Sequence, residues 1–186
     1  MLHQPRVLLL GLAALAALGI TTLACGAGTQ IDDPQPNVEV VSPKSGLKVG
    51  ATISSVSLGD GSAASLQLAF FANEASAAAT VSIKSLVLVD ASTKATVDTL
   101  TSSNPRVWSG ASYEPWNERV TPGGDLKASY QLTTPSWSKI DSNGAVGRGS
   151  SRSYSTPFRL IVTLEIDGVE VVLESSELHR EPVAVT

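Results

Sequence analysis

Residues 158–173 read FRLIVTLEIDGVEVVL, and this stretch decides the fold of the chain. Every second residue from Phe158 to Ile166 is apolar, and the alternation resumes after Asp167-Gly168. A period of two is typical of a β-strand with one buried face. Asp-Gly favours a type I′ turn, because both central residues of that turn take positive φ. The stretch therefore predicts an antiparallel hairpin that contributes one face to a core.

Three further stretches, at residues 66–70, 81–89 and 126–132, show the same period and are expected to form core strands. The run at 86–89 is apolar without a break, which predicts either burial on both faces or a bulge that changes the face. Weaker strands are expected at Val38–Val41, Ile53–Leu58, Ala95–Leu100 and Asn117–Val120.

About eight short antiparallel strands predict an all-β domain over residues 38–178, built as an antiparallel β-sandwich, with a closed barrel as the alternative. The strand spacing resembles that of immunoglobulin-like and fibronectin-like domains. That resemblance implies two packed sheets, although the cysteine pair of true immunoglobulin domains is absent, since Cys25 is the only cysteine. Residues 179–186 form a polar tail after the domain.

Two long connections without periodicity are expected at residues 101–118 and 133–156. Loops of this length are usually functional or disordered. Exposed aromatic rings on loops can stack on sugars or anchor a partner. The alternative is that the rings close the ends of the sandwich. The candidate binding surface consists of four residues in or beside these connections: Trp108, Tyr113, Trp116 and Trp137.

The amino-terminal residues 1–24 have the layout of a secretory signal peptide. Arg6 precedes the uncharged run Val7–Ile20, which is expected to be helical. This run falls short of the roughly 20 apolar residues that cross a bilayer as a helix. Residues 26–37, with Gly, Asp and Pro, predict a flexible tether to the domain.

The stretch Thr22-Leu23-Ala24-Cys25 resembles the lipobox of bacterial lipoproteins. That family usually has Leu, Val or Ile at the position of Thr22 and a small residue at the position of Leu23. The resemblance implies that Cys25 carries palmitate or a similar acyl chain and that acylation holds the protein in the cell envelope. Gly26, in place of the Asp that favours inner-membrane retention, implies the outer membrane of a Gram-negative bacterium. The alternatives are an ordinary signal peptide with a free thiol at Cys25, or a disulfide to another chain.

The charge balance argues against nucleic-acid binding. The formal net charge is −4, and removal of the signal, which contains only the cation Arg6, makes it −5. No basic patch for nucleic acid is apparent. No disulfide can form within the exported domain once Cys25 is acylated, so its core alone must hold it.

Known catalytic and metal-binding patterns fit the sequence poorly. His179 is the single histidine after the signal and is expected to be solvated, so neither a hydrolase triad nor a zinc site is predicted. Ser-x-x-Lys occurs at 45–48 and 136–139, but without the further motifs of penicillin-recognising enzymes. Residues 141–144 imitate the start of a calcium loop, whose twelfth position is Arg152 instead of Glu. No catalytic residue, metal or cofactor is therefore expected.

The favoured hypothesis is a non-enzymatic, lipid-anchored envelope protein that binds a protein or glycan partner or acts as a structural accessory. A first alternative is a glycan-active enzyme that uses carboxylates such as Glu114 and Glu118 near Trp116. A second alternative is a carrier of apolar ligands, which requires a partly empty barrel.

Overall fold

The hairpin expected from residues 158–173 is confirmed. Strand β12 (Phe158–Ile166) pairs with β13 (Val169–Glu174) in antiparallel register, with Ile166 opposite Val169. Asp167 and Gly168 have φ of 50° and 93°, the two positive values that a type I′ turn requires. The alternate apolar residues of β12 are all buried, as their spacing predicts. The hairpin therefore forms one wall of the core.

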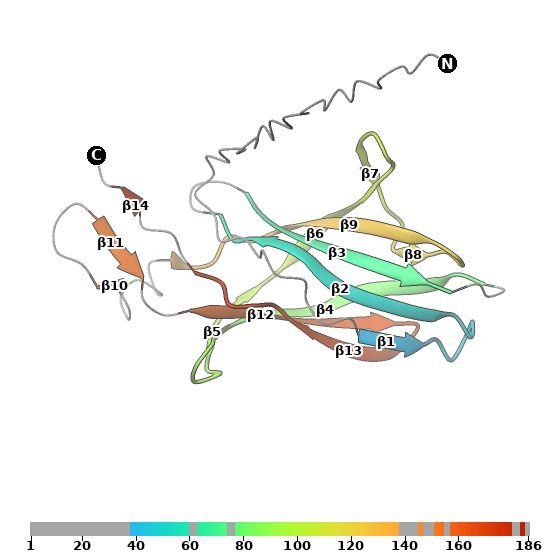
Figure 1. The fold of residues 1–186 in the computed structure, drawn as a ribbon, viewed down its shortest axis with the longest axis horizontal. Helices are drawn as coiled ribbons and strands as arrows, with labels where there is room; N and C mark the ends of the chain where they lie inside the picture. The colour runs from blue at the N-terminus through green and yellow to red at the C-terminus, as the bar shows by residue number, and fades with distance from the viewer. Residues whose placement is uncertain are drawn as a thin grey trace, which may run out of the picture.

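The computed structural model describes residues 38–59, 63–73, 77–137, 145–146, 151–154, 157–179 and 183–184. The other strands of its two large sheets are β1 (Val38–Val41), β2 (Lys48–Ser57), β3 (Ala64–Ala72), β4 (Ala79–Asp90), β5 (Thr96–Leu100), β6 (Ser102–Trp108), β7 (Tyr113–Pro115), β8 (Arg119–Val120) and β9 (Asp125–Leu132). Three short strands, β10 (Ala145–Val146), β11 (Ser151–Tyr154) and β14 (Val183–Ala184), form a small sheet beside one end (Figure 1).

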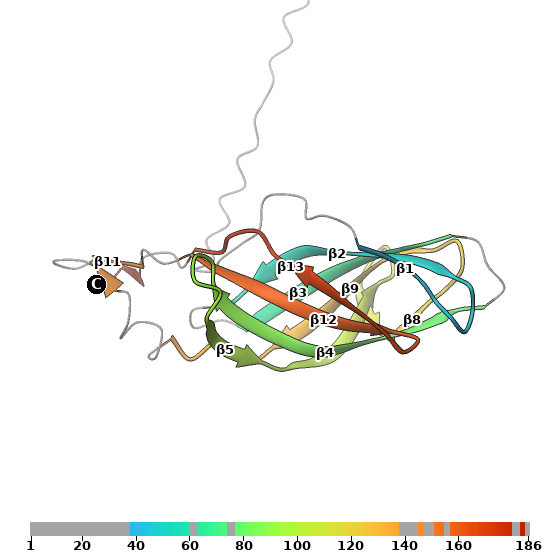
Figure 2. The same cartoon turned by 90° about the horizontal axis from the view of Figure 1, so that it is seen from below.

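The large sheets are antiparallel and pack face to face as a sandwich (Figure 1). The first sheet has the order β1-β2-β3-β9-β6-β7. The second has the order β13-β12-β4-β5, and β8 pairs with the start of β4. Seen from below, the second sheet lies nearer the viewer, in front of β2, β3 and β9 (Figure 2). The architecture is thus the expected sandwich and not the alternative barrel.

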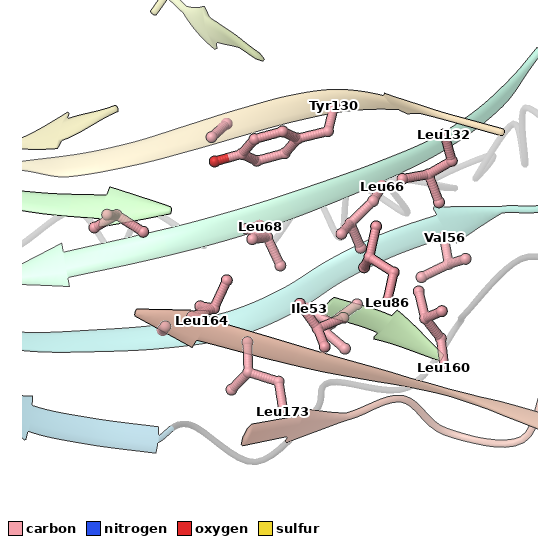
Figure 3. Close-up of a cluster of buried hydrophobic side chains, with 14 of the residues drawn as sticks. Ile53, Val56, Leu66, Leu68, Leu86, Tyr130, Leu132, Leu160, Leu164 and Leu173 are labelled. Atoms are coloured by element: carbon pink, nitrogen blue, oxygen red, sulfur yellow. The ribbon is translucent and has the colours of Figure 1, made fainter. Parts of the chain in front are cut away.

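The core fills the space between the two sheets. Leu66 and Leu68 of β3 point toward Leu160 and Leu164 of β12, and Tyr130 enters the same core from β9 (Figure 3). Because side chains on a strand alternate between faces, one residue in two from each strand enters this layer. The alternate residues of each strand, which do not enter the core, form the outer faces of the two sheets.

Strand β4 contains a bulge just before the apolar run at 86–89, and within the run Leu88 and Val89, which point to opposite faces, are both buried. Ile83 lies opposite Leu164 and Ser85 opposite Thr163, so Lys84 is the extra residue. The ammonium of Lys84 contacts Glu165 at 3.1 Å. The bulge thus turns one cation outward while the apolar residues on either side continue the strand.

The prediction of a loop over residues 101–118 is wrong, because β6 and β7 form a hairpin there. The apolar alternation is interrupted by Asn104-Pro105, where β6 has a bulge between Ser103 and Arg106. A bulge accommodates proline, which has no N–H to donate to the sheet. The period-two signal is therefore lost while the strand continues.

The connection at residues 133–156 is also not wholly irregular. It contains β10 and β11, and β11 pairs with β14, which falls in the segment expected to be a tail. Residues 138–144, 147–150 and 155–156 lie outside the described residues. Of the strand expected at Asn117–Val120, only Arg119–Val120 pairs, with the start of β4.

Candidate functional site

Two of the four candidate aromatic residues form a pair at the end of the β6–β7 hairpin. Trp108 lies opposite Tyr113, their ring centroids are 5.2 Å apart, and their planes are tilted by 60°. The turn between them closes through Ser109, whose N–H donates to the Ser112 carbonyl at 2.9 Å. Trp108 is 45% exposed. Figure 1 shows this hairpin rising beyond β9.

Polar neighbours fix the Tyr113 side of the pair. The side-chain amide of Gln67, on β3, donates to the Tyr113 hydroxyl at 3.0 Å. The Arg106 guanidinium donates to the Tyr113 backbone carbonyl. The tyrosine is thereby tied to the outer face of the first sheet two strands away from its own hairpin. Rings held in this way lose little conformational freedom when a ligand binds.

Two cations lie on the same outer face as the aromatic pair. Val107 pairs with Ala128 and faces inward, so the next residues, Trp108 and Lys127, leave their strands on the outer face. Arg106 lies on the same face and is exposed. We call Gln67, Arg106, Trp108, Tyr113 and Lys127 the Trp108 platform. In the part of the chain that the structure describes, neither of its two cations forms an ion pair.

On the outer face of the second sheet, in contrast, the cations form ion pairs with glutamates of the protein. Lys94 Nζ and Arg159 Nη1 contact the same oxygen of Glu174, at 2.7 and 3.0 Å. Arg159 Nη2 also contacts Glu177 Oε1 at 3.3 Å. The hydrogen bond from Lys94, supported by the one from Arg159, holds the pKa of Glu174 below its ordinary value. These cations are already engaged by carboxylates of the protein.

Trp116 is partly buried and packs against the core, in line with the alternative that the rings close the sandwich. Its ring lies 5.7 Å from Phe70 and 6.3 Å from Tyr130, measured between centroids. Its indole N–H donates to the Arg119 carbonyl at 3.1 Å, and its backbone N–H donates to the Pro105 carbonyl at 3.0 Å. We call the segment 116–120, with Phe70 and Tyr130, the closed end of the sandwich.

The carboxylates named in the enzyme hypothesis stand in different surroundings. Glu114 is exposed on β7, whereas Glu118 is half-buried at the closed end, where burial raises its pKa. Burial, and secondarily the charge of Glu118, also raises the pKa of Tyr130, whose buried hydroxyl has no hydrogen-bond partner within the described structure. The Glu118 carbonyl accepts a bond from Val81 N–H at 2.8 Å, which ties this segment to β4.

Trp137 serves the opposite end of the sandwich. Its indole N–H donates to the Gly59 carbonyl at 2.8 Å, just after β2, and its ring packs partly buried against the core. The preceding Ser136 N–H donates to Asp98 Oδ2 at 2.7 Å. Trp137 therefore fastens the start of the 133–156 connection to the sandwich.

The remaining candidates do not assemble a reactive site. Ser45 lies in the β1–β2 turn, where its hydroxyl accepts the Leu47 N–H at 3.3 Å, and Lys48 forms an ion pair with Glu39. His179 is exposed, as expected. Within the described ranges, no group of three His, Cys, Asp or Glu side chains is placed to hold a metal ion.

Four of the predicted features fall wholly or partly on residues that the structure does not describe. They are Cys25 with its signal peptide, the tether at residues 26–37, the end of the Ser-x-x-Lys stretch at residues 136–139, and the turn at residues 141–144. Among the residues that are described, no helix is long and apolar enough to cross a membrane.

Three platform residues were missed from the sequence: Gln67, Arg106 and Lys127. Alternation places Gln67 and Lys127 on the outer faces of their strands, but only the sheet order brings β3, β9 and β6 together. Arg106 and Trp108 are two residues apart, which in a strand places both on one face. This signal was not used, because the segment was predicted to be a loop. No family model, curated protein or solved structure matches this chain.

Proposed function

We propose that this chain is an envelope lipoprotein, anchored through acylated Cys25, whose sandwich binds a glycan without catalysing a reaction. The anchor is supported by the stretch Thr22-Leu23-Ala24-Cys25 at the end of an apolar run. Several acyl chains together hold a protein on a membrane, since each buried methylene contributes about 0.8 kcal/mol. The proposal includes the outer membrane as the location and an immunoglobulin-like arrangement of the sandwich.

One observation carries the binding function: the exposed Trp108 contacts the half-buried Tyr113, which Gln67 and Arg106 hold in place. Trp116 and Trp137 are packed against the core, where they contribute to folding. Trp108 stands in solvent beside a tyrosine that is fixed through Gln67. An exposed large aromatic side chain costs solubility, so a fixed pair on an open sheet face favours a contact role.

Affinity electrophoresis tests the binding function. The full chain, purified in detergent, is run through gels that contain neutral or acidic polysaccharides or solubilised peptidoglycan. We expect at least one of them to retard the protein, and Trp108→Ala to remove the retardation. Val172→Ala is the matched control, because Val172 is also exposed, at 56%, but on the second sheet. Unchanged mobility in every gel would overturn the proposal.

The anchor has a separate test. Cys25→Ala should move the protein out of the membrane fraction that detergent extracts. Unchanged fractionation, together with no fatty acid on the mature protein, would contradict acylation.

A further inference from the structure

We propose that the Trp108 platform recognises acidic polysaccharides, with its aromatic rings against sugar rings and with Arg106 and Lys127 against carboxylate groups. This inference rests on the proposed function and adds the charge of the ligand to it.

The first argument is the charge of the platform. The chain as a whole is acidic, with a formal net charge of −4, yet the outer face at the platform carries two cations, Arg106 and Lys127, against one exposed carboxylate, Asp125. On the second sheet Lys84, Lys94 and Arg159 are each paired with a glutamate. Arg106 and Lys127 have no such partner within the described chain. An anionic ligand could therefore form ion pairs with both cations without displacing a carboxylate of the protein.

The second argument is the way Arg106 is held. Its guanidinium donates to the backbone carbonyl of Tyr113, which places the charge next to the aromatic pair. A guanidinium has five N–H donors, so this one bond leaves others for a ligand. Arginine and carboxylate can form two parallel hydrogen bonds, which makes the contact directional as well as electrostatic.

The third argument is the polarity around the rings, which favours a sugar polymer over an apolar protein surface. The face around Trp108 and Tyr113 carries Gln67, Ser129 and Lys127, and the outward Ala69 is only 7% exposed; the one exposed large apolar residue of β3 on this face, Phe71, lies opposite Asp125 and not beside the rings. The centre of a protein interface is usually a continuous apolar patch. Two rings surrounded by hydrogen-bonding groups instead fit a ligand with small apolar faces and many hydroxyls.

A matched pair of probes tests the charge. Polygalacturonate carries one carboxylate on each sugar, and its methyl ester has the same backbone without the charge. In affinity electrophoresis of the full chain in detergent, we expect several-fold tighter binding to the acid than to the ester. This preference should shrink as salt is added, because exposed charges are screened beyond about 10 Å at 0.1 M salt.

Two variants connect the effect to the platform. Lys127→Gln should weaken binding to the acid about two- to five-fold and leave binding to the ester unchanged, since a single exposed charge contact contributes little. Trp108→Ala should weaken binding to both by about tenfold or more, as expected for a central aromatic contact. Lys94→Gln, on the second sheet, is the control and should bind like the parent. Urea unfolding verifies that each variant is folded.

The outcomes separate this inference from the proposed function. Equal binding to acid and ester, lost in Trp108→Ala, would overturn the preference for acidic ligands and support glycan binding. Binding to the acid that Lys127→Gln leaves unchanged would overturn the assignment of the charge contact to the platform. Retardation by neither probe, but by a neutral polysaccharide, would also overturn the inference while the proposed function stands. No retardation by any polysaccharide would overturn both.

Discussion

Trp108 and Trp116 lie eight residues apart on the same hairpin, yet they have opposite environments. Trp116 packs on Phe70 and Tyr130 at the closed end, and both of its N–H groups have backbone acceptors. Trp108 contacts Tyr113 on the outer face and is 45% exposed. The same residue type therefore stabilises the fold at one place and remains available to a ligand at the other.

The difference arises because Trp116 begins the segment in which the chain crosses from the first sheet to the second, whereas Trp108 lies within the first sheet. After β7 the segment 116–120 passes over the end of the sandwich to reach β4, and a large ring placed there covers the core. Trp108 precedes the hairpin turn, and its ring contacts Tyr113 across the hairpin. We expect substitutions at the closed end to change stability and substitutions on the platform to change binding.

The largest expected effect separates the two tryptophans directly. Trp116→Ala should lower the free energy of unfolding by about 3 kcal/mol, because it removes a large ring that packs on the core. Trp108→Ala should cost less than about 1 kcal/mol, as for exposed positions generally. Urea denaturation of both variants measures the contrast. Similar losses for the two variants would break the comparison.

An intermediate effect concerns the backbone of the closed end. Glu118 has φ of 56°, which is unfavourable for any residue with a Cβ atom, and its half-buried carboxylate is poorly solvated. Glu118→Gly should therefore raise the free energy of unfolding by about 1 kcal/mol. Asn104→Gly is the matched control, because Asn104 has a similar φ of 52° that asparagine tolerates. A loss of stability in Glu118→Gly would show that its side chain supports the closed end.

The smallest expected effect depends on pH and concerns a junction at the same end. Asp167 accepts hydrogen bonds from the Ser42 hydroxyl at 2.5 Å and from Thr80 N–H at 2.9 Å. These bonds join the β12–β13 turn to the β1–β2 turn and to the start of β4. Burial acts to raise the pKa of Asp167, but these bonds and nearby Lys44 outweigh it, so the pKa lies below its ordinary value of 3.8. The carboxylate therefore stabilises the fold above that pH, and its contribution is lost as the pH falls through the lowered pKa.

Asp167→Asn tests this contribution, because asparagine also tolerates the positive φ of the turn. At pH 7 the variant should be less stable by up to about 1 kcal/mol, and the difference should shrink as the pH falls below 3.8 and through the lowered pKa. Urea midpoints across this range measure it. A difference that does not change with pH would mean that the charge of Asp167 plays no part.

The sequence predicted most of the sandwich because a sheet with one buried face has strands in which apolar and polar residues alternate. Strand Val38–Val41 and the 158–173 hairpin were predicted at or near their bounds. The hairpin of β6 and β7 was missed because Asn104 and Pro105 interrupt the alternation at a bulge. Bulges and edge strands obey the same physics, but their pattern is too short to recognise alone.

The candidate site was predicted in part. Its aromatic residues were identified as a group, but composition could not separate the two rings that are packed against the core from the pair on the outer face. That separation depends on which strand each residue follows and on what lies beneath it. The anchor at Cys25 stays a prediction from the sequence.

The sequence by itself determined the fold class and the 158–173 hairpin, because each depends on residues close together along the chain, and the lipoprotein-like start is likewise a local pattern that stays a prediction. Only the tertiary structure decided which aromatic rings are exposed and which cations lie beside them. Gln67, Arg106 and Lys127 are separated by 20 or more residues, and hydrogen bonding between β3, β9 and β6 brings them to one face. Sheet order is a property of the whole chain, so no local pattern could reveal the platform.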